Sequence, residues 1–192
     1  ASTREEEVGQ RAKTIEMQGI RLRRLVDNLN LSGKLEFGAG KFEKQKVRIS
    51  RFLRKTLTDI MNQTEDERYR FMLEIEDSLQ DLELYFNEDL VERAVMNLLH
   101  NAIRHNEGGC RIEMKLYQDR KNHVFLKLSD TGKGVSKELL SRLNSRSYAW
   151  ESGIGQHGLG LKIVKQVADW HRWKLSFANG EQGGFACTIR LR

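Results

Sequence analysis

The chain has 192 residues, of which 39% are hydrophobic and 31% are charged, with a formal net charge of +6 and no proline. This length suffices for one well-packed core with an additional segment, and no apolar run is long enough to span a bilayer, so the sequence predicts a soluble chain. Residues 41–55 are mainly basic and residues 65–92 mainly acidic, but neither stretch carries a groove-reading motif. We therefore expect no nucleic-acid partner.

The first predicted element is a long helix over residues 5–35. Its apolar positions repeat every seven residues, at Val8, Ile15, Leu22 and Leu29. This period is typical of helix bundles and coiled coils. Glycines then interrupt the pattern, and we place a hinge at about Gly38. The sequence thus predicts a bundle helix with its hinge over residues 1–38 and a second domain over residues 39–192.

Short strands and helices follow in the second domain. The patterns predict strands at 42–49, 70–76, 82–86, 111–119, 123–129, 174–178 and 185–191. They predict helices from Ser50 as the capping residue to about 62, from about 88 to 105, at 136–143 and at 158–171. Because strands and helices mix without strict alternation, we expect an α+β fold, a two-layer α/β sandwich with a mixed sheet packed on about three helices.

Two asparagines stand four residues apart in the predicted helix that begins near Glu88. Asn97 and Asn101 project from the same face of that helix, away from its apolar side. Their amide oxygens are uncharged ligands suited to a hard cation such as Mg²⁺, which keeps several waters and is shared with substrate phosphates. If the helix is considered alone, two solvated asparagines are the alternative interpretation.

Two glycine clusters follow the asparagine helix. Asp130-Thr-Gly-Lys-Gly134 ends an apolar strand, and its glycines permit a tight turn beside a ligand. A carboxylate there can accept a hydrogen bond from an exocyclic amine, although an ordinary Asp-x-Gly turn is the alternative. Further on, Gly158-Leu-Gly160 opens a helix, whose first backbone amides and dipole form an anion site.

With the asparagine helix first, the Asp-x-Gly-x-Gly turn second and the Gly-x-Gly-Leu helix start third, the chain resembles the catalytic, ATP-binding domain of sensor histidine kinases. These kinases share the Bergerat ATP-binding fold with gyrase, heat-shock chaperones and MutL, and the resemblance covers nearly the whole chain. It implies binding of ATP and Mg²⁺, with Asp130 on the adenine amino group and the glycine-rich helix start on the phosphates. The residues implied for ATP binding are Asn97, Asn101, Arg104, His105, Asp130, Gly132, Gly134, Gly155, His157, Gly158, Leu159 and Gly160, with Asn101 and Asn97 for Mg²⁺.

The resemblance also bears on the reaction. In the superfamily's ATPases, a Glu one helical turn before the metal-binding Asn activates water as a general base. Here Asn97 stands at that position, and an amide cannot take up the proton. The resemblance therefore implies a protein-histidine kinase, in which transfer of the γ-phosphoryl group rests on positioning and charge neutralisation. The alternatives are a regulatory ATPase or serine kinase, which steady ATP turnover would favour, and an interaction module that binds no adenine nucleotide.

The resemblance leaves the phosphoacceptor outside the chain. None of the five histidines lies in a His-Glu-x-x-x-Pro setting, so no catalytic residue is predicted here and the fragment is not expected to autophosphorylate alone. Residues 20–36 resemble the second helix of the dimerisation and phosphotransfer domain, and the first helix, with the acceptor His, is expected before residue 1. The phenylalanine-rich box of the family's lid is absent from residues 139–143.

Partners and location are likewise implied by the resemblance. We expect a response regulator as partner, a homodimer through the full bundle, and a membrane-anchored parent whose cytoplasmic portion contains this fragment. Two cysteines, Cys110 and Cys187, stand far apart and lack metal-binding spacing. This pattern favours reduced, packed thiols, which suits a cytoplasmic location.

Overall fold

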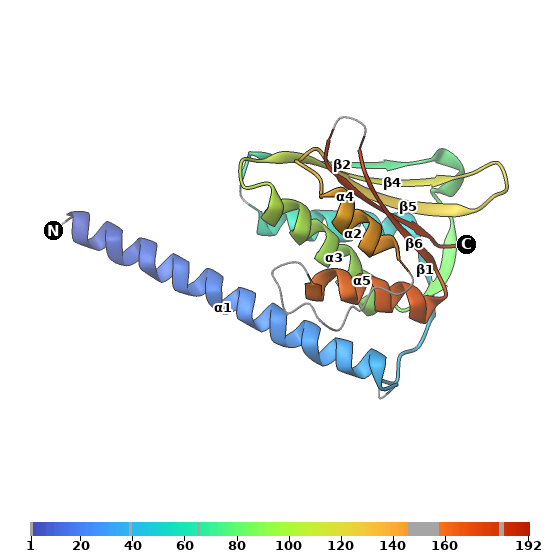
Figure 1. Cartoon of the computed structure of the whole chain (residues 1–192), viewed down its shortest axis with the longest axis horizontal. Coiled ribbons are helices and arrows are strands. Elements are labelled where there is room, and N and C mark those ends of the chain that lie inside the picture. The colour runs from blue at the N-terminus through green and yellow to red at the C-terminus, as the bar shows by residue number, and fades with distance from the viewer. Residues whose placement is uncertain (1, 39, 65, 146–157, 181–182) are drawn as a thin grey trace. The chain divides into compact units, whose positions relative to one another are not determined.

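The computed structural model describes residues 2–38, 40–64, 66–145, 158–180 and 183–192 (Figure 1). The chain divides into two compact units, Ala1–Gly40 and Lys41–Arg192. The strands found in the described residues all belong to the second unit. The two units are therefore described separately.

The first unit consists of helix α1 (Ser2–Glu36), as the sequence predicts. Ile15, Leu22 and Leu29 lie seven residues apart on this helix, and each is well exposed. An apolar stripe with this period is the pattern with which helices pack in bundles. None of the helices in the described residues has the length and apolarity needed to cross a lipid bilayer.

The second unit contains strands and helices close to those predicted. In chain order, its described elements are β1 (Gln45–Arg48), α2 (Ile49–Gln63), β2 (Tyr69–Ile75), η1 (Asp77–Leu79), β3 (Glu83–Phe86), α3 (Glu88–His105), β4 (Cys110–Gln118), β5 (Val124–Asp130), α4 (Lys137–Asn144), α5 (Gly158–His171), β6 (Lys174–Asn179) and β7 (Phe185–Arg190). One sheet has the strand order β2-β4-β5-β7-β6, in which β2 is parallel to β4 and the other neighbours are antiparallel. The predicted mixed sheet is confirmed.

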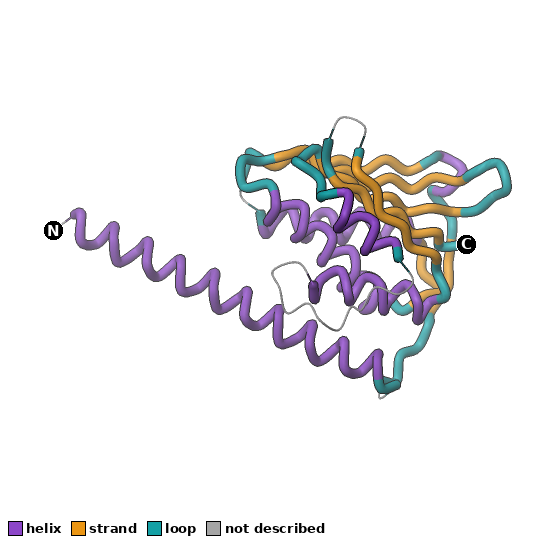
Figure 2. The backbone as a smooth tube through the Cα atoms, in the orientation of Figure 1, coloured by secondary structure: helices purple, strands orange, loops and turns teal. Residues whose placement is uncertain are grey.

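The helices of this unit cover one face of the five-stranded sheet, which gives the predicted two-layer α+β fold (Figure 2). On β4, Ile112, Met114 and Leu116 are fully buried, while the residues between them remain partly exposed. This alternation is expected for a strand with one face against the core. The short helix α4, which corresponds to the helix predicted at 136–143, lies against β6.

The start of α2 differs from the prediction that Ser50 caps this helix. The helix begins at Ile49, and the capping position is taken by Arg48 without a side-chain hydrogen bond. The Ser50 hydroxyl instead donates to the carbonyl oxygen of Gln80 at 2.6 Å. Residues 80–82 run beside the helix start, where the Ile49 N–H donates to the Leu82 carbonyl oxygen, and a tertiary contact therefore replaces the local cap.

The two strands predicted at 70–76 and 82–86 are present, but they do not pair with each other. Strand β2 lies beside β4 in the larger sheet, whereas β3 pairs with β1 as a separate two-stranded sheet. The strands predicted at 174–178 and 185–191 are present as β6 and β7, which are antiparallel neighbours.

Candidate functional site

The asparagine pair of α3 lies against the start of α5. A β-carbon built on Gly160 would lie 3.5 Å from Oδ1 of Asn97 and 3.6 Å from both polar side-chain atoms of Asn101. Helix α5 begins at Gly158, where the first backbone N–H groups have no partner within the helix and form the positive end of its dipole. The structure thus places the asparagines beside a helix start that suits an anion.

The orientation of α3 follows from its apolar face. Its buried residues are Leu90, Val91, Ala94, Val95, Leu98, Leu99 and Ala102. Because these positions recur at intervals of three and four residues, they cover one side of the helix. Asn97 and Asn101 are only half-buried, at the border of this face where α5 begins. Burial of the apolar face therefore turns the two amides toward the α5 start.

Asp130 ends β5, and its carboxylate closes the turn that follows. Its Oδ1 atom accepts hydrogen bonds from the backbone N–H of Gly132 at 2.8 Å and from Nδ2 of Asn106 at 3.2 Å. The Thr131 N–H donates to the carbonyl oxygen of Arg111 on β4, and the Arg111 N–H donates to the Thr131 hydroxyl. The half-buried Asp130 side chain is therefore held in one orientation at the sheet edge.

The β6–β7 hairpin packs against the Asp130 turn. The Asn179 side chain accepts the Val135 N–H at 3.0 Å and donates to the Val135 carbonyl oxygen at 2.7 Å. Gly184 has a φ of +85°, and a β-carbon there would lie 1.8 Å from the carbonyl oxygen of Asp130. Both the backbone conformation and the close contact require glycine at this position.

The described side chains near Asp130 do not form a metal site whose ligands all come from the protein. Burial, and next the nearby Asp130 carboxylate, raise the pKa of the Cys110 thiol, so this cysteine remains protonated at neutral pH. In the described ranges, no cluster of three or more His, Cys, Asp or Glu side chains could hold a metal ion. The donors that do converge are the amides of Asn97 and Asn101, and they fit a hard cation that shares its ligands with a bound phosphate.

Some of the other predicted site residues lie in described elements, and some lie outside the described residues. Arg104 and His105 occupy the last turn of α3 and are exposed. Leu159 lies in the first turn of α5 and is half-buried. Gly155 and His157 lie outside the residues that the structure describes.

Three further residues, Asn106, Asn179 and Gly184, contact the Asp130 turn from two directions and were not among the predicted site residues. Asn106 directly follows α3, and asparagine is common at helix ends, so a local signal for its position existed. Nothing in the sequence indicated that its side chain reaches Asp130. Asn179 and Gly184 lie between the strands predicted at 174–178 and 185–191, and nothing in the sequence marked either one as a site residue.

Residues 86–192 match the family of histidine kinase-, DNA gyrase B-, and HSP90-like ATPases. The match contains α3, the Asp130 turn and α5, which are the elements that form the site. The chain belongs to this family. ATP is accordingly the nucleotide of this domain.

Similar proteins carry the description of sensor kinases. The chain is 27% identical over 190 residues to the sensor histidine kinase YvrG of Bacillus subtilis, covering 97% of this chain and 32% of that protein. It is 29% identical over 171 residues to the sensor protein QseC of Escherichia coli O157:H7, covering 88% of this chain and 36% of that protein. The chain therefore spans about a third of the length of these curated relatives.

Solved structures show the same fold. The histidine kinase AdeS of Acinetobacter baumannii aligns with a TM-score of 0.71 and 18% sequence identity, covering 93% of this chain and 81% of that chain. At this identity the likeness concerns the fold. The chain thus has a fold like that of this solved histidine kinase.

Proposed function

We propose that the chain is the ATP-binding catalytic part of a two-component sensor histidine kinase. In this proposal it binds Mg-ATP and passes the γ-phosphoryl group to a histidine of the dimerisation domain, for onward transfer to an aspartate of a response regulator. The observation that carries the proposal is the position of Asn97 and Asn101 against the start of α5. The similarity to sensor histidine kinases supports it.

Each element of the site receives one role. The Asp130 carboxylate accepts the exocyclic amino group of adenine. Backbone N–H groups at the start of α5 hold the phosphates, as helix starts commonly do. The amide oxygens of Asn101 and Asn97 face the same region and serve as ligands for Mg²⁺. When bound, this ion neutralises charge on the transferring phosphoryl group.

Asn97 directs the proposal toward transfer instead of hydrolysis. Its amide cannot accept a proton from water, whereas the superfamily's ATPases carry a general-base Glu at this place in the helix. An imidazole nucleophile needs no such base, so holding the reactants in line is sufficient. The site as proposed therefore positions ATP and leaves water unactivated.

The first unit completes the proposal. We assign residues 1–38 as the second helix of a dimerisation domain and its hinge, with residues 39–192 as the catalytic domain. The exposed stripe of Ile15, Leu22 and Leu29 would pack within a bundle formed by two subunits. The acceptor histidine would lie on another helix of that bundle, and the catalytic part would work on the cytoplasmic side of the membrane.

Calorimetric titration with Mg-ATP tests the site. We expect Asn101→Ala and Asp130→Ala each to weaken binding about 10- to 100-fold, since each removes a polar contact to a charged or desolvated group. Asn144→Ala is a suitable control, because this polar residue ends α4 and bonds to the backbone of Phe177. Wild-type affinity in both site variants would contradict the assignment.

The reaction is tested separately with radiolabelled ATP. The chain alone should acquire no acid-labile phosphate and should release little inorganic phosphate. A labelled histidine within the chain would contradict the proposed acceptor, and steady ATP turnover would favour an ATPase.

A further inference from the structure

Asn106, the residue that follows α3, connects this helix to Asp130. Its side-chain Nδ2 group donates to the carbonyl oxygen of Ala102 at 2.7 Å and to Oδ1 of Asp130 at 3.2 Å. The first bond satisfies a carbonyl group at the helix end, where no intrahelical donor is available. The second bond reaches the end of β5. Both amide hydrogens of Asn106 are therefore used, one on each element.

The two oxygens of the Asp130 carboxylate consequently differ. Oδ1 accepts from Asn106 and from the backbone N–H of Gly132. Within the described residues, no donor bonds to Oδ2. Two donors on one oxygen fix the rotation of the carboxylate, which leaves the other oxygen available to a ligand.

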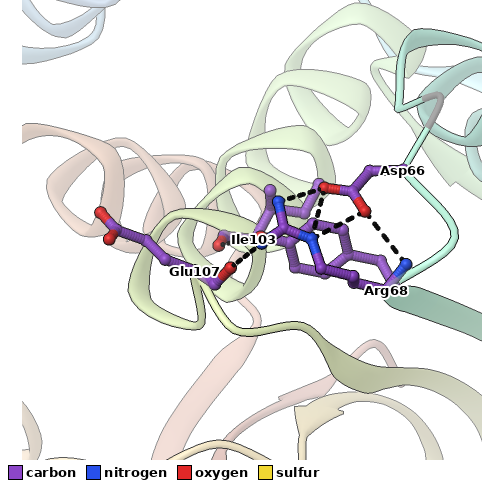
Figure 3. A network of polar contacts seen from close by, with 5 residues as sticks. Asp66, Arg68, Ile103 and Glu107 are labelled. Carbon is purple, nitrogen blue, oxygen red and sulfur yellow. Dashed lines mark hydrogen bonds and ion pairs between the residues drawn. The ribbon is translucent and has the colours of Figure 1, made fainter.

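The turn that carries Asn106 is itself held in place. Nη1 of Arg68 donates to the carbonyl oxygen of Glu107 at 2.7 Å, and the carboxylate of Asp66 binds the Arg68 guanidinium (Figure 3). The Tyr69 hydroxyl donates to the carbonyl oxygen of Ile103 at 3.2 Å. These contacts occupy acceptors at the end of α3 and so restrict the backbone on both sides of Asn106.

The Asn106 side chain occupies the space that a β-carbon at position 132 would need. A β-carbon on Gly132 would lie 1.6 Å from Oδ1 and 2.4 Å from Cγ of Asn106. No side chain at position 132 can coexist with Asn106 in this position. The asparagine amide therefore lies directly on the glycine of the Asp-x-Gly turn, where its location depends on the absence of a β-carbon.

We propose that Asn106 is a specificity-determining positioning residue, which holds the Asp130 carboxylate so that Oδ2 faces the exocyclic amine of adenine. This inference rests on the proposed function, since it assumes that Asp130 contacts the base. A carboxylate fixed in this way accepts from the 6-amino group of adenine but meets the 6-oxo group of guanine as a second acceptor. Asn106 thereby sets the preference for adenine without touching the base.

The experiment compares Mg-ATP with Mg-GTP and with purine riboside triphosphate, which lacks the 6-amino group, by calorimetric titration. Asn106→Asp keeps the shape of the side chain but removes both donated hydrogen bonds. We expect it to weaken ATP binding about tenfold or more, because the Asp130 carboxylate, no longer bonded by Asn106 and repelled by a second carboxylate, does not keep Oδ2 toward the adenine amine. Its affinity for purine riboside triphosphate should stay within about twofold of the wild type, since that ligand makes no amine contact.

Asn144→Asp is the matched control. Asn144 also ends a helix and donates to the carbonyl group four residues earlier, but its second bond goes to the backbone of Phe177. This control should retain the wild-type ratio of ATP affinity to purine riboside triphosphate affinity. If Asn144→Asp lowers the ratio of ATP affinity to purine riboside triphosphate affinity as Asn106→Asp does, the effect arises from a general loss of packing around the site. That result would overturn the inference.

A double-mutant cycle tests the same inference without relying on Asn106→Asp. Gly132→Ala forces Asn106 out of place and should reduce the preference for ATP about as much as Asn106→Ala does. The variant that combines Gly132→Ala with Asn106→Ala should keep at least the preference for ATP that each single variant keeps. The reason is that the collision at position 132 disappears when Asn106 is truncated. Additive losses would overturn the inference.

The outcomes separate the inference from the proposed function. If Asp130→Ala leaves ATP affinity unchanged, the proposed function fails and the inference fails with it. If Asp130→Ala abolishes the adenine preference while Asn106→Asp and Asn106→Ala both retain it, only the role of Asn106 is refuted.

Discussion

The two ends of helix α3 are held by different kinds of contact. At its start, Asn87 accepts the Leu90 N–H through its side chain, donates to the Glu43 carbonyl oxygen, and donates its backbone N–H to Nε2 of His171 at 3.1 Å. His171 is only 5% exposed. These contacts involve no formal charge.

At the other end of α3, charged side chains at the surface hold the backbone in place. Arg68 binds the carbonyl oxygen of Glu107 and pairs with Asp66 at 2.6 Å, and both of these side chains are substantially exposed. Exposed ion pairs contribute little to folding stability, whereas breaking a buried hydrogen bond leaves an unsatisfied group in the core. The start of α3 should therefore govern stability, and its end should govern how the Asp130 turn is positioned.

The largest expected effect is a loss of stability at acidic pH that originates at His171. Its Nδ1–H donates to the Val167 carbonyl oxygen, so Nε2 is the acceptor and the ring is neutral. Burial lowers the pKa of His171 to about 4 from the usual value near 6.5. The unfolded chain therefore binds this proton more tightly, and up to about 3 kcal/mol of stability, complete above pH 6.5, is lost as the pH falls toward 4.

Urea denaturation between pH 7.5 and 4.5 measures this loss, with His171→Gln as the control. The glutamine amide is neutral throughout this range and offers both a donor and an acceptor. Its stability should fall less steeply between about pH 6.5 and 4.5 than that of the wild type. Parallel curves for the two proteins would show that His171 does not cause the acid sensitivity.

A smaller effect is expected for Asn87→Ala, which removes the cap of α3. The loss should be about 1 to 2 kcal/mol, since the side chain caps the helix and also bonds to the Glu43 carbonyl oxygen. Ser136→Ala removes the cap of α4, which is exposed and accepts the Leu139 N–H, and should cost less. Equal losses in chemical denaturation would mean that the bond to Glu43 adds nothing.

The smallest effect on stability is expected for Arg68→Ala, because an exposed ion pair contributes little to folding stability. The same change should nevertheless lower the preference for ATP over purine riboside triphosphate, by less than about fivefold, because the turn carrying Asn106 loses one contact. Lys46→Ala breaks another exposed ion pair, with Glu83, and should leave this preference intact. If Arg68→Ala behaves like Lys46→Ala in both measurements, the end of α3 needs no ion pair to position Asp130.

Local patterns predicted the elements that carry the site. The apolar periodicity around Asn97 and Asn101 gave helix α3 with its predicted start, and the glycine pair at 158 and 160 gave the start of α5. The order of these motifs also indicated the ATPase family, which the match over residues 86–192 confirms. These features could be predicted because each depends on residues close together in the chain.

Contacts between distant segments could not be predicted in this way. Asn106 forms a hydrogen bond with Asp130, which is 24 residues away in the sequence, and Asn179 forms one with Val135, which is 44 residues away. The same limit explains Ser50, whose sequence context suited a helix cap but whose hydroxyl is taken by Gln80, 30 residues later. In each case an amide or hydroxyl has several local and distant partners of similar strength, and only the packing of the elements selects among them.

The surroundings of His171 have a further, spectroscopic consequence. The chain contains three tryptophans, and two of them flank this ring: Trp173 stacks on it at 4.3 Å between centroids and Trp170 meets it edge-on at 4.6 Å. Phe42 and Lys44, from the first residues of the second unit, contact the Trp170 ring as well. Indole emission depends on such neighbours, so the intrinsic fluorescence of the unlabelled protein should report on the junction where the entering chain, α5 and the cap of α3 meet.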